Sequence, residues 1–403
     1  MIFITVVVLF ILLYIAWFKY KDLLCPAVIH NIFWILSFII LPTLDASDEV
    51  ILGLYFFVIG GAIVFQLGFS LTNKYKFINS RKKINLVPGK KIIPNKFNIK
   101  IFIIFSFIFF IIGFWQYFRF LSGSNFNLWY SAITSANQNL ELPFIFNYIK
   151  KVIQYSSLCL LIIYWYSDKI YRHNIKIYVL LEFVMASLCV ISVPTRNNML
   201  FFILPLIVIY MITHNISNRK ILRIFVYALG LFLLYYYIVS KGKYWYNYYE
   251  SDSTLKTLWN EIKIYLSGSL VALSHSIKNN SFTKYGGNSL RYFLRIYDVI
   301  LGTSLAPELV QDFVQIGSVT TNVYTFYDWY LRDFGILYAL LAQFIVGMIH
   351  GRVYSSVKRK RGMYWVYIFA MLMYPLVMQF FQDQYLSLLS TWIQIVLVGF
   401  FIL

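Results

Sequence analysis

Apolar runs of about twenty residues, the length that lets an α-helix cross a bilayer, recur along almost the whole chain. The composition agrees with this, since 60% of the residues are hydrophobic and only 13% are charged. A β-barrel is disfavoured, because its strands are short and alternate apolar with polar residues. We therefore expect an all-α polytopic integral membrane protein.

The apolar runs predict about eleven transmembrane helices. They lie near 1–18, 24–42, 50–70, 100–122, 144–167, 177–193, 198–214, 222–240, 333–350, 363–381 and 385–403. The expected organisation is an N-terminal bundle of about eight helices over 1–240, a large extracytoplasmic segment over 241–332, and about three C-terminal helices over 333–403. The extracytoplasmic segment thus lies between the eighth and ninth helices.

The net charge of +19 is explained mainly by membrane topology. The segment 72–100 holds nine Lys and Arg residues and no acid, which predicts a cytoplasmic loop. The other basic loops then fall on the same side, with the N-terminus outside and the C-terminus in the cytoplasm. The segment 241–332 is also rich in Lys and Arg, but long loops do not follow this bias. No nucleic-acid partner is expected.

Few familiar catalytic or metal-binding signals occur. Cys25, Cys159 and Cys189 all fall in apolar runs, without the spacing of a disulfide framework or a metal site. We expect no metal and no cofactor. Glu182 falls inside a predicted span, where an acid is either functional or paired with a nearby lysine.

Three arginines are candidate ligands of an anion. Arg196 lies in the turn between the sixth and seventh predicted helices, where it is either an interfacial arginine or a phosphate ligand. Arg291 and Arg295 share one helix face after a Gly–Gly turn at 286–287, although Asp298 could form an ion pair with Arg295. The three arginines together could hold a diphosphate.

The stretch TNVYTFYDWYLRDFG, residues 321–335, places charges and amides directly before an apolar run. Asp333 is expected at the start of the following helix, where the helix dipole favours an acid and it could be merely a cap. Asp328 and Arg332 are four residues apart and could form a salt bridge. The aromatic residues are expected to form either an interfacial belt or the wall of a sugar-binding cleft: Tyr324, Phe326, Tyr327, Trp329 and Tyr330.

Three blocks follow one another in the second half of the chain: YLSGSLVAL, YGGNSLRYFLR and TTNVYTFYDWYLRDFGILYALLAQFIVGMIHGRVYS. Their order resembles the tyrosine–glycine segment, the glycine–arginine segment and the N-x-Y-T…D-F-G block of Wzy-type oligosaccharide repeat-unit polymerases of bacterial surface polysaccharides. The motif resemblance covers residues 265–355 and the Arg196 turn. The predicted topology is similar along nearly the whole chain.

The resemblance implies a C-type glycosyltransferase-like membrane enzyme that needs no metal. Such a polymerase lies in the bacterial inner membrane and has its active site on the periplasmic face. It transfers the growing glycan, of O-antigen or capsule type, from undecaprenyl diphosphate to an incoming lipid-linked repeat unit. The implied partners are undecaprenyl-diphosphate-linked oligosaccharide, membrane lipid and a chain-length regulator.

The resemblance also implies roles for individual residues. The diphosphate ligands would be Arg196, Arg291 and Arg295, which would stabilise the leaving group as charge develops. The general base would be Asp333 in the first place, with Asp328 and His275 behind it. The sugar ligands would be Asn322, Tyr324, Thr325 and Arg332.

Two other functions fit much of the same pattern. An O-antigen ligase would use the same donor but a lipid A core as acceptor, and a lipid-linked oligosaccharide flippase would transport without chemistry. The N-x-Y-T…D-F-G block favours the polymerase over the ligase. The single long outer segment, the lack of an internal repeat and the odd number of helices are unlike an inverted-repeat transporter.

Overall fold

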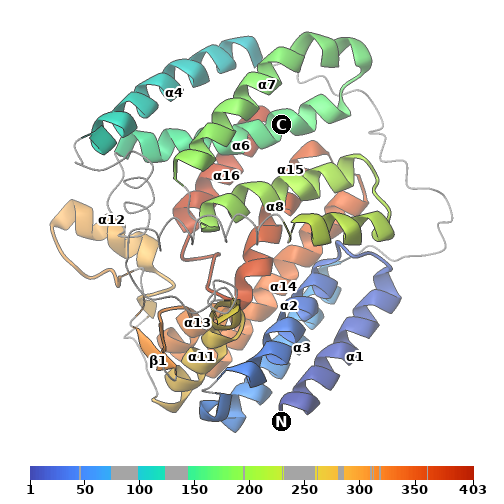
Figure 1. Cartoon of the computed structure of the whole chain (residues 1–403), viewed down its shortest axis with the longest axis vertical. Coiled ribbons are helices and arrows are strands. Elements are labelled where there is room, and N and C mark those ends of the chain that lie inside the picture. Colours follow the sequence, from blue (N-terminus) through green and yellow to red (C-terminus); the bar gives the residue numbers. More distant parts are fainter. Residues whose placement is uncertain are drawn as a thin grey trace. The chain divides into compact units, whose positions relative to one another are not determined.

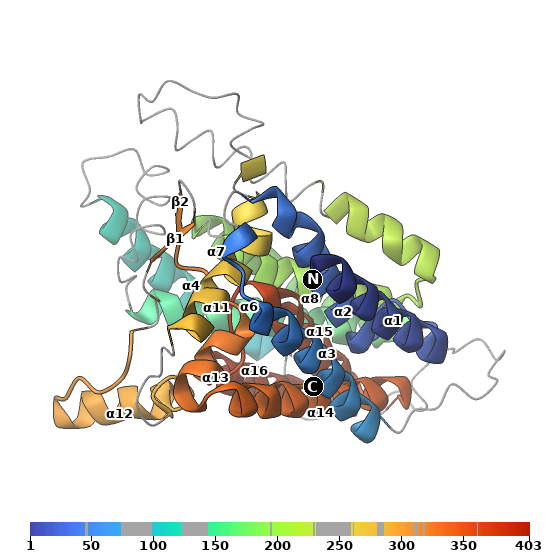
Figure 2. The same ribbon diagram turned by 90° about the horizontal axis from the view of Figure 1, so that it is seen from below.

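The structure is a computed structural model that describes residues 1–44, 47–73, 99–122, 144–193, 196–228, 230, 259–260, 262–279, 286–308, 311, 313–316, 319–360 and 362–403. These residues are mostly helical (Figures 1 and 2). They belong to two compact units, and each is described by itself. The first unit comprises Met1–Ser80, Tyr249–Arg359 and Pro375–Trp392, and the second comprises Arg81–Tyr248, Lys360–Tyr374 and Ile393–Leu403.

The membrane class expected from the sequence is confirmed. Among the described residues, seven helices are long and apolar enough to cross a bilayer. They are Ile2–Tyr20, Pro26–Thr43, Leu52–Thr72, Ile99–Phe120, Lys169–Ser192, Ile336–Lys358 and Met363–Phe380. Two shorter apolar helices occupy Asn197–Thr213 and Leu389–Ile402. The count of eleven remains a prediction, and most of the run expected at 222–240 lies outside the described residues.

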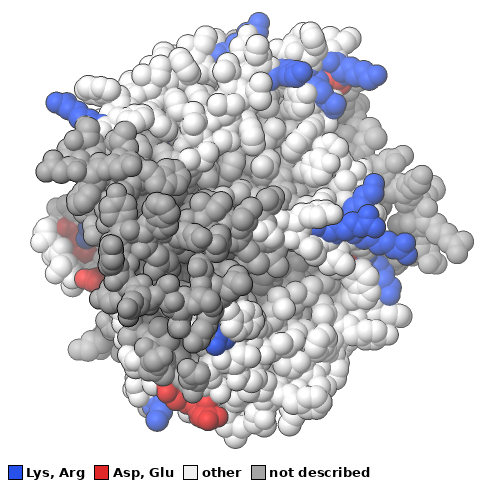
Figure 3. Space-filling model, in the orientation of Figure 1, with Lys and Arg blue, Asp and Glu red and all other residues white. Residues whose placement is uncertain are grey.

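Large apolar side chains cover much of the described surface. On the helix Ile99–Ser122, for example, Ile104, Phe105 and Trp115 are each more than half exposed. Figure 3 shows one face on which wide areas between the charged side chains carry neither Lys, Arg, Asp nor Glu. A surface of this kind is expected where a protein contacts lipid rather than water.

The first unit is built around a bundle of helices near the N-terminus and the helix α14. Its elements are α1 (Ile2–Tyr20), α2 (Pro26–Ile40), η1 (Leu41–Thr43), η2 (Ser47–Glu49), α3 (Leu52–Thr72), the π-helical turn η3 (Ile264–Gly268), α11 (Ser269–Lys278), α12 (Arg291–Leu301), β1 (Val314–Ile316), β2 (Val319–Thr321), α13 (Phe326–Phe334), α14 (Ile336–Lys358) and η5 (Met378–Phe380). The two strands are antiparallel, with Gln315 opposite Thr320.

The second unit contains α4 (Ile99–Ser122), α6 (Phe144–Tyr166), α7 (Lys169–Ser192) and α8 (Arg196–Thr213). Helices α4, α6 and α7 pack against one another. Two C-terminal helices, α15 (Met363–Val377) and α16 (Leu389–Ile402), are each divided between the two units. In α15 the division falls at Pro375, a residue that lacks the N–H of a regular helical hydrogen bond.

Close contact between α3 and α14 is made possible by glycines. A Cβ atom added at Gly347 would lie 2.3 Å from the carbonyl oxygen of Phe65, and one at Gly351 would lie 2.3 Å from that of Phe69. Both distances are far below van der Waals contact, and both contacts are with backbone, which cannot rotate away. Small residues spaced four apart let helix backbones approach in this way in membrane proteins.

Buried polar side chains join helices inside the first unit. The Gln343 amide of α14 contacts His30 of α2 at 2.7 Å and donates to Gln379 at 3.1 Å. Gln379 in turn contacts the Tyr385 hydroxyl, which lies 2.8 Å from His350. Such hydrogen bonds satisfy polar groups that would otherwise be costly to bury, and they restrict how these segments can pack.

The helix expected to begin at Asp333 begins later, at Ile336. Gly335 separates α13 from α14 and has φ of 83°, a backbone conformation that other residues adopt only with strain. Asp333 therefore lies in the last turn of α13. The interpretation of Asp333 as an N-terminal cap of the following helix is wrong.

Candidate functional site

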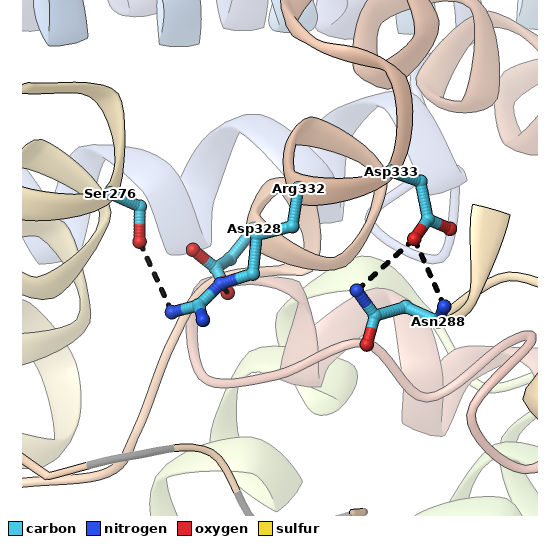
Figure 4. A network of polar contacts seen from close by, with 5 residues as sticks. All are labelled: Ser276, Asn288, Asp328, Arg332 and Asp333. Carbon is cyan, nitrogen blue, oxygen red and sulfur yellow. Dashed lines mark hydrogen bonds and ion pairs between the residues drawn. The ribbon is translucent and has the colours of Figure 1, made fainter. Parts of the chain in front are cut away.

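The residues predicted to carry chemistry in the first unit come from α11, α12, α13 and the loop before α13. Figure 4 shows how Asp328, Arg332 and Asp333 of α13 face α11 on one side and the turn before α12 on the other. Segments far apart in the sequence thus meet along a helix of nine residues.

Asp333 binds the turn that leads into α12. Its Oδ1 accepts hydrogen bonds from the backbone N–H of Asn288 at 2.9 Å and from the Asn288 side-chain amide at 3.2 Å (Figure 4). Its Oδ2 accepts from the backbone N–H of Ser289 at 2.7 Å. Asp333 as a whole is 5% exposed. Hydrogen bonds to an ionised acceptor are stronger than neutral ones. Asp333 consequently fixes where α12 begins.

The same two segments also touch through an apolar contact. Gly286 has φ of 74°, and a Cβ atom added there would lie 2.8 Å from the ring of Phe334. The predicted Gly turn is thus present, and it provides space for Phe334 as well as backbone freedom. The asparagine and serine that hold Asp333 were missed by the sequence analysis, because no local pattern relates residues so far apart in the chain.

Asp328 and Arg332 form the predicted salt bridge. Arg332 Nε lies 2.7 Å from Asp328 Oδ2, and the Arg332 guanidinium also donates to the Ser276 hydroxyl of α11 at 3.3 Å (Figure 4). The guanidinium lies over the ring of Tyr324, 4.8 Å from its centroid. Asp328 is fully buried, whereas the Arg332 side chain keeps 13% exposure. Arg332 therefore links α11, α13 and the loop before α13.

Burial raises the pKa of Asp328 from its ordinary value of 3.8 to about 6, and the Arg332 guanidinium limits this rise. Since the folded protein holds the proton more tightly, Asp328 stabilises the fold below about pH 4, and this contribution is lost as the pH rises through about 6. The two pKa values differ by about two units, which corresponds to about 3 kcal/mol.

We therefore predict that stability falls more steeply with pH in the wild type than in Asp328→Asn. Thermal unfolding in detergent between pH 4 and pH 7 measures this fall in stability. The difference in unfolding temperature between the two proteins should level off above pH 7. Parallel pH profiles for the two proteins would contradict the assignment.

Arg291 and Arg295 lie on α12, as predicted. Arg291 Nε donates to the carbonyl oxygen of Pro307 at 2.8 Å, and burial together with the neighbouring Arg295 lowers the pKa of Arg291. Arg295 is exposed, and no hydrogen bond or ion pair joins it to another described residue. The alternative that Asp298 forms an ion pair with Arg295 is wrong: none joins the two side chains, and the Asp298 carboxylate accepts from Thr303 and from the backbone N–H groups of Leu305 and Ala306.

His275 lies on α11 and pairs with an acid that the sequence analysis did not single out. Its Nε2 is 2.8 Å from Oε2 of Glu49, and the two side chains are 34% and 43% exposed. The Ser274 hydroxyl donates to the Glu49 carbonyl oxygen and accepts from the N–H of Ile51, so the backbone around Glu49 is fixed against α11. A carboxylate in this position can orient an imidazole through a hydrogen bond to its ring nitrogen.

The aromatic residues of 321–335 are not an interfacial belt. All five are almost completely buried: Tyr324, Phe326, Tyr327, Trp329 and Tyr330. They pack in the interior of the first unit, where Tyr327, for example, contacts Trp34 and Phe57. Of the predicted sugar ligands, Tyr324 and Thr325 are buried, whereas Asn322 and Arg332 keep partial exposure.

The remaining candidates lie in the second unit. Arg196 is the first residue of α8, and its side chain lies outside the described part of the structure. Glu182 of α7 accepts hydrogen bonds from Ser106 and Ser156, so the alternative that it pairs with a lysine is wrong.

The three cysteines are free and buried. Within the described residues, no three His, Cys, Asp or Glu side chains are grouped as metal ligands would be.

The fold and these contacts define a polytopic helical membrane protein with a polar site on α11–α13. The chain is similar to an O-antigen polymerase of Shigella dysenteriae, with 28% identity over 217 residues, which are 52% of this chain and 50% of that protein. The matched segment therefore spans about half the length of this curated relative. No protein-family model and no solved structure matches the chain. The similarity supports the resemblance to Wzy-type polymerases.

Proposed function

We propose that this protein polymerises undecaprenyl-diphosphate-linked oligosaccharide repeat units of a bacterial surface polysaccharide, on the outer face of the inner membrane. The observation that carries the proposal is the similarity to an O-antigen polymerase over 217 residues. The membrane-spanning helices support it, because both substrates would carry long polyprenyl chains. A chain-length regulator is a proposed partner.

The proposed reaction is a glycosyl transfer without metal or cofactor. An acceptor hydroxyl oxygen forms a bond to the anomeric carbon of the donor glycan, and the bond between that carbon and the diphosphate oxygen breaks. The hydroxyl proton passes to a base, and undecaprenyl diphosphate leaves with the electron pair. The protein therefore needs cations at the diphosphate and a base near the acceptor.

Arg291 and Arg295 are proposed to bind the donor diphosphate. Two guanidiniums four residues apart on one helix repel each other, so a bound anion between them would be favourable. Arg295 is exposed, and its helix is positioned through Asp333. This gives Asp333 a positioning role in the proposal, because both of its oxygens already hold donors from the turn. Asn322 and Arg332 are proposed to contact sugar.

His275 is the proposed general base. The sequence ranks Asp333 first, but among the three candidates His275 has the most exposed side chain and an acid that orients it. His275→Gln is expected to lower the rate of polymerisation by about 10²-fold, the usual contribution of a general base, with little change in thermal stability. A His275→Gln enzyme with wild-type turnover would exclude this role.

The proposal is tested with purified protein in vesicles that contain lipid-linked repeat units from the host. The wild type should convert single units into a ladder of polymers and release undecaprenyl diphosphate. Arg295→Gln should slow both the formation of polymer and the release of undecaprenyl diphosphate. Arg223→Gln should change neither rate, because Arg223 is exposed and belongs to the second unit, at a predicted cytoplasmic loop. If the wild type leaves the single units unchanged under conditions that preserve its fold, the proposed function is wrong.

A further inference from the structure

Two adjacent lysines in α6 have no role in the function described so far. Lys150 is only 6% exposed, and Lys151 beside it is half-buried. An ammonium group is costly to bury in a membrane helix unless a counter-ion or other polar partner accompanies it. A buried lysine at this place therefore requires an explanation.

No described carboxylate neutralises Lys150. No ion pair joins it to another described residue, and its electrostatic neighbours are Lys151 and the Cys189 thiol. Glu182, a buried acid on the adjacent helix α7, is instead bound by two serine hydroxyls. The described groups around Lys150 thus leave a net positive charge, which a bound anion would neutralise.

Polar side chains of α6 and α8 meet one turn after Lys150, in the N-terminal part of α6. Gln154, one turn after Lys150, donates from its amide to Asn198 at 3.3 Å. Asn198 donates in turn to the carbonyl oxygens of Val190 and Val193, which joins the end of α7 to the start of α8. Arg196 occupies the first position of α8, two residues before Asn198. Polar side chains of α6 and α8 are therefore available one turn from Lys150 in the second unit.

We propose that Lys150 and Lys151 form a binding site for the phosphate group of a membrane lipid, and that this lipid is the second lipid-linked substrate. The proposal rests on the proposed function, since a polymerase of this kind joins two molecules that each carry a diphosphate. The α12 arginines of the first unit would hold one diphosphate, and Lys150 and Lys151 would hold the other. Lysine binds phosphate as a compact point charge with several donors.

The number of bound lipids tests this proposal. Native mass spectrometry of the full-length protein in detergent counts bound undecaprenyl diphosphate, with phosphatidylglycerol and inorganic phosphate as competitors. The wild type should bind two molecules of undecaprenyl diphosphate and Lys150→Met one. Lys100→Met should still bind two, because Lys100 is an exposed lysine of the same unit. Lys150→Met removes a buried charge that no described carboxylate neutralises, so this variant should stay folded.

A second measurement uses the wild type alone. Amine labelling followed by peptide mass spectrometry should show that undecaprenyl diphosphate protects Lys151, the half-buried lysine of the pair, and leaves Lys100 reactive. Two bound lipids in Lys150→Met, or unchanged labelling of Lys151, would overturn the site. Equal protection by phosphatidylglycerol would overturn the assignment to substrate and leave a phospholipid site. A wild type that shows this binding yet makes no polymer would refute the proposed function and not the site.

Discussion

Replacing Asp333 with asparagine is expected to lower the free energy of unfolding by about 3 kcal/mol, since it removes charge-assisted hydrogen bonds to the turn before α12. An asparagine offers one acceptor oxygen and turns an NH₂ group towards the donors that Asp333 now binds. Polymerisation should fall by about 10²-fold as well, because α12 would no longer hold its arginines in place. Thermal unfolding and the vesicle polymerisation assay measure the two effects on the same preparation.

Ser289→Ala is the matched control. The Ser289 backbone N–H binds Asp333, whereas its hydroxyl has no hydrogen-bond partner among the described residues. The alanine variant keeps the N–H and should unfold and polymerise as the wild type does. If Asp333→Asn melts at the wild-type temperature and is nevertheless inactive, Asp333 is the general base that the sequence ranks first, and the positioning role is wrong.

Gly347→Ala is expected to destabilise the first unit by several kcal/mol. The added methyl group would lie 2.3 Å from a backbone oxygen of α3, so the two helices would have to separate along their length. Overpacking of this kind usually costs about 1–3 kcal/mol, and more where the obstacle is backbone. The expected observations are a lower unfolding temperature in detergent and a loss of monodisperse protein in size-exclusion chromatography.

Gly60→Ala provides the comparison within the same pair of helices. A Cβ atom at Gly60 would lie 3.7 Å from the Leu340 side chain, which is ordinary contact. Alanine favours helix over glycine by about 1 kcal/mol, so this variant should be as stable as the wild type or slightly more stable. A Gly347→Ala protein that also unfolds like the wild type would show that α3 and α14 do not approach as closely as described.

The membrane class and the position of most described helices could be predicted from the sequence, because a run of apolar residues must form a helix in lipid to satisfy its own backbone. The Asp328–Arg332 pair was predictable for a similar reason, since residues four apart on a helix are neighbours. Both features depend only on local sequence.

The errors arose where distant segments decide the structure. The sequence leaves the aromatic residues of 321–335 as either an interfacial belt or the wall of a cleft, but they are buried inside the first unit, where Tyr327 contacts Trp34 of α2 and Phe57 of α3. Asp333 is expected at the start of a helix, but the next helix begins at Ile336, after Gly335. The Asp333 carboxylate instead binds Asn288, 45 residues earlier in the chain. Periodicity and helix-end rules carry no information about such partners.

Lys150 and Glu49 were missed for the same physical reason. A lysine inside an apolar run can extend to the interface or be enclosed, and only the surrounding helices distinguish these cases. Glu49 stands in a short predicted outer loop, and nothing in its local sequence indicates the contact with His275 on α11.

The central claim is that the chain polymerises lipid-linked repeat units, and the most direct measurement is made in the host cell. The gene is deleted and then restored as wild type, Arg295→Gln or Arg223→Gln, and surface polysaccharide is separated on a gel. Single repeat units on the lipid core are expected after deletion, and a full ladder is expected with wild type and Arg223→Gln but not with Arg295→Gln. If deletion instead leaves no units at the surface and lipid-linked repeats accumulate inside the cell, the protein is a flippase and the account is contradicted.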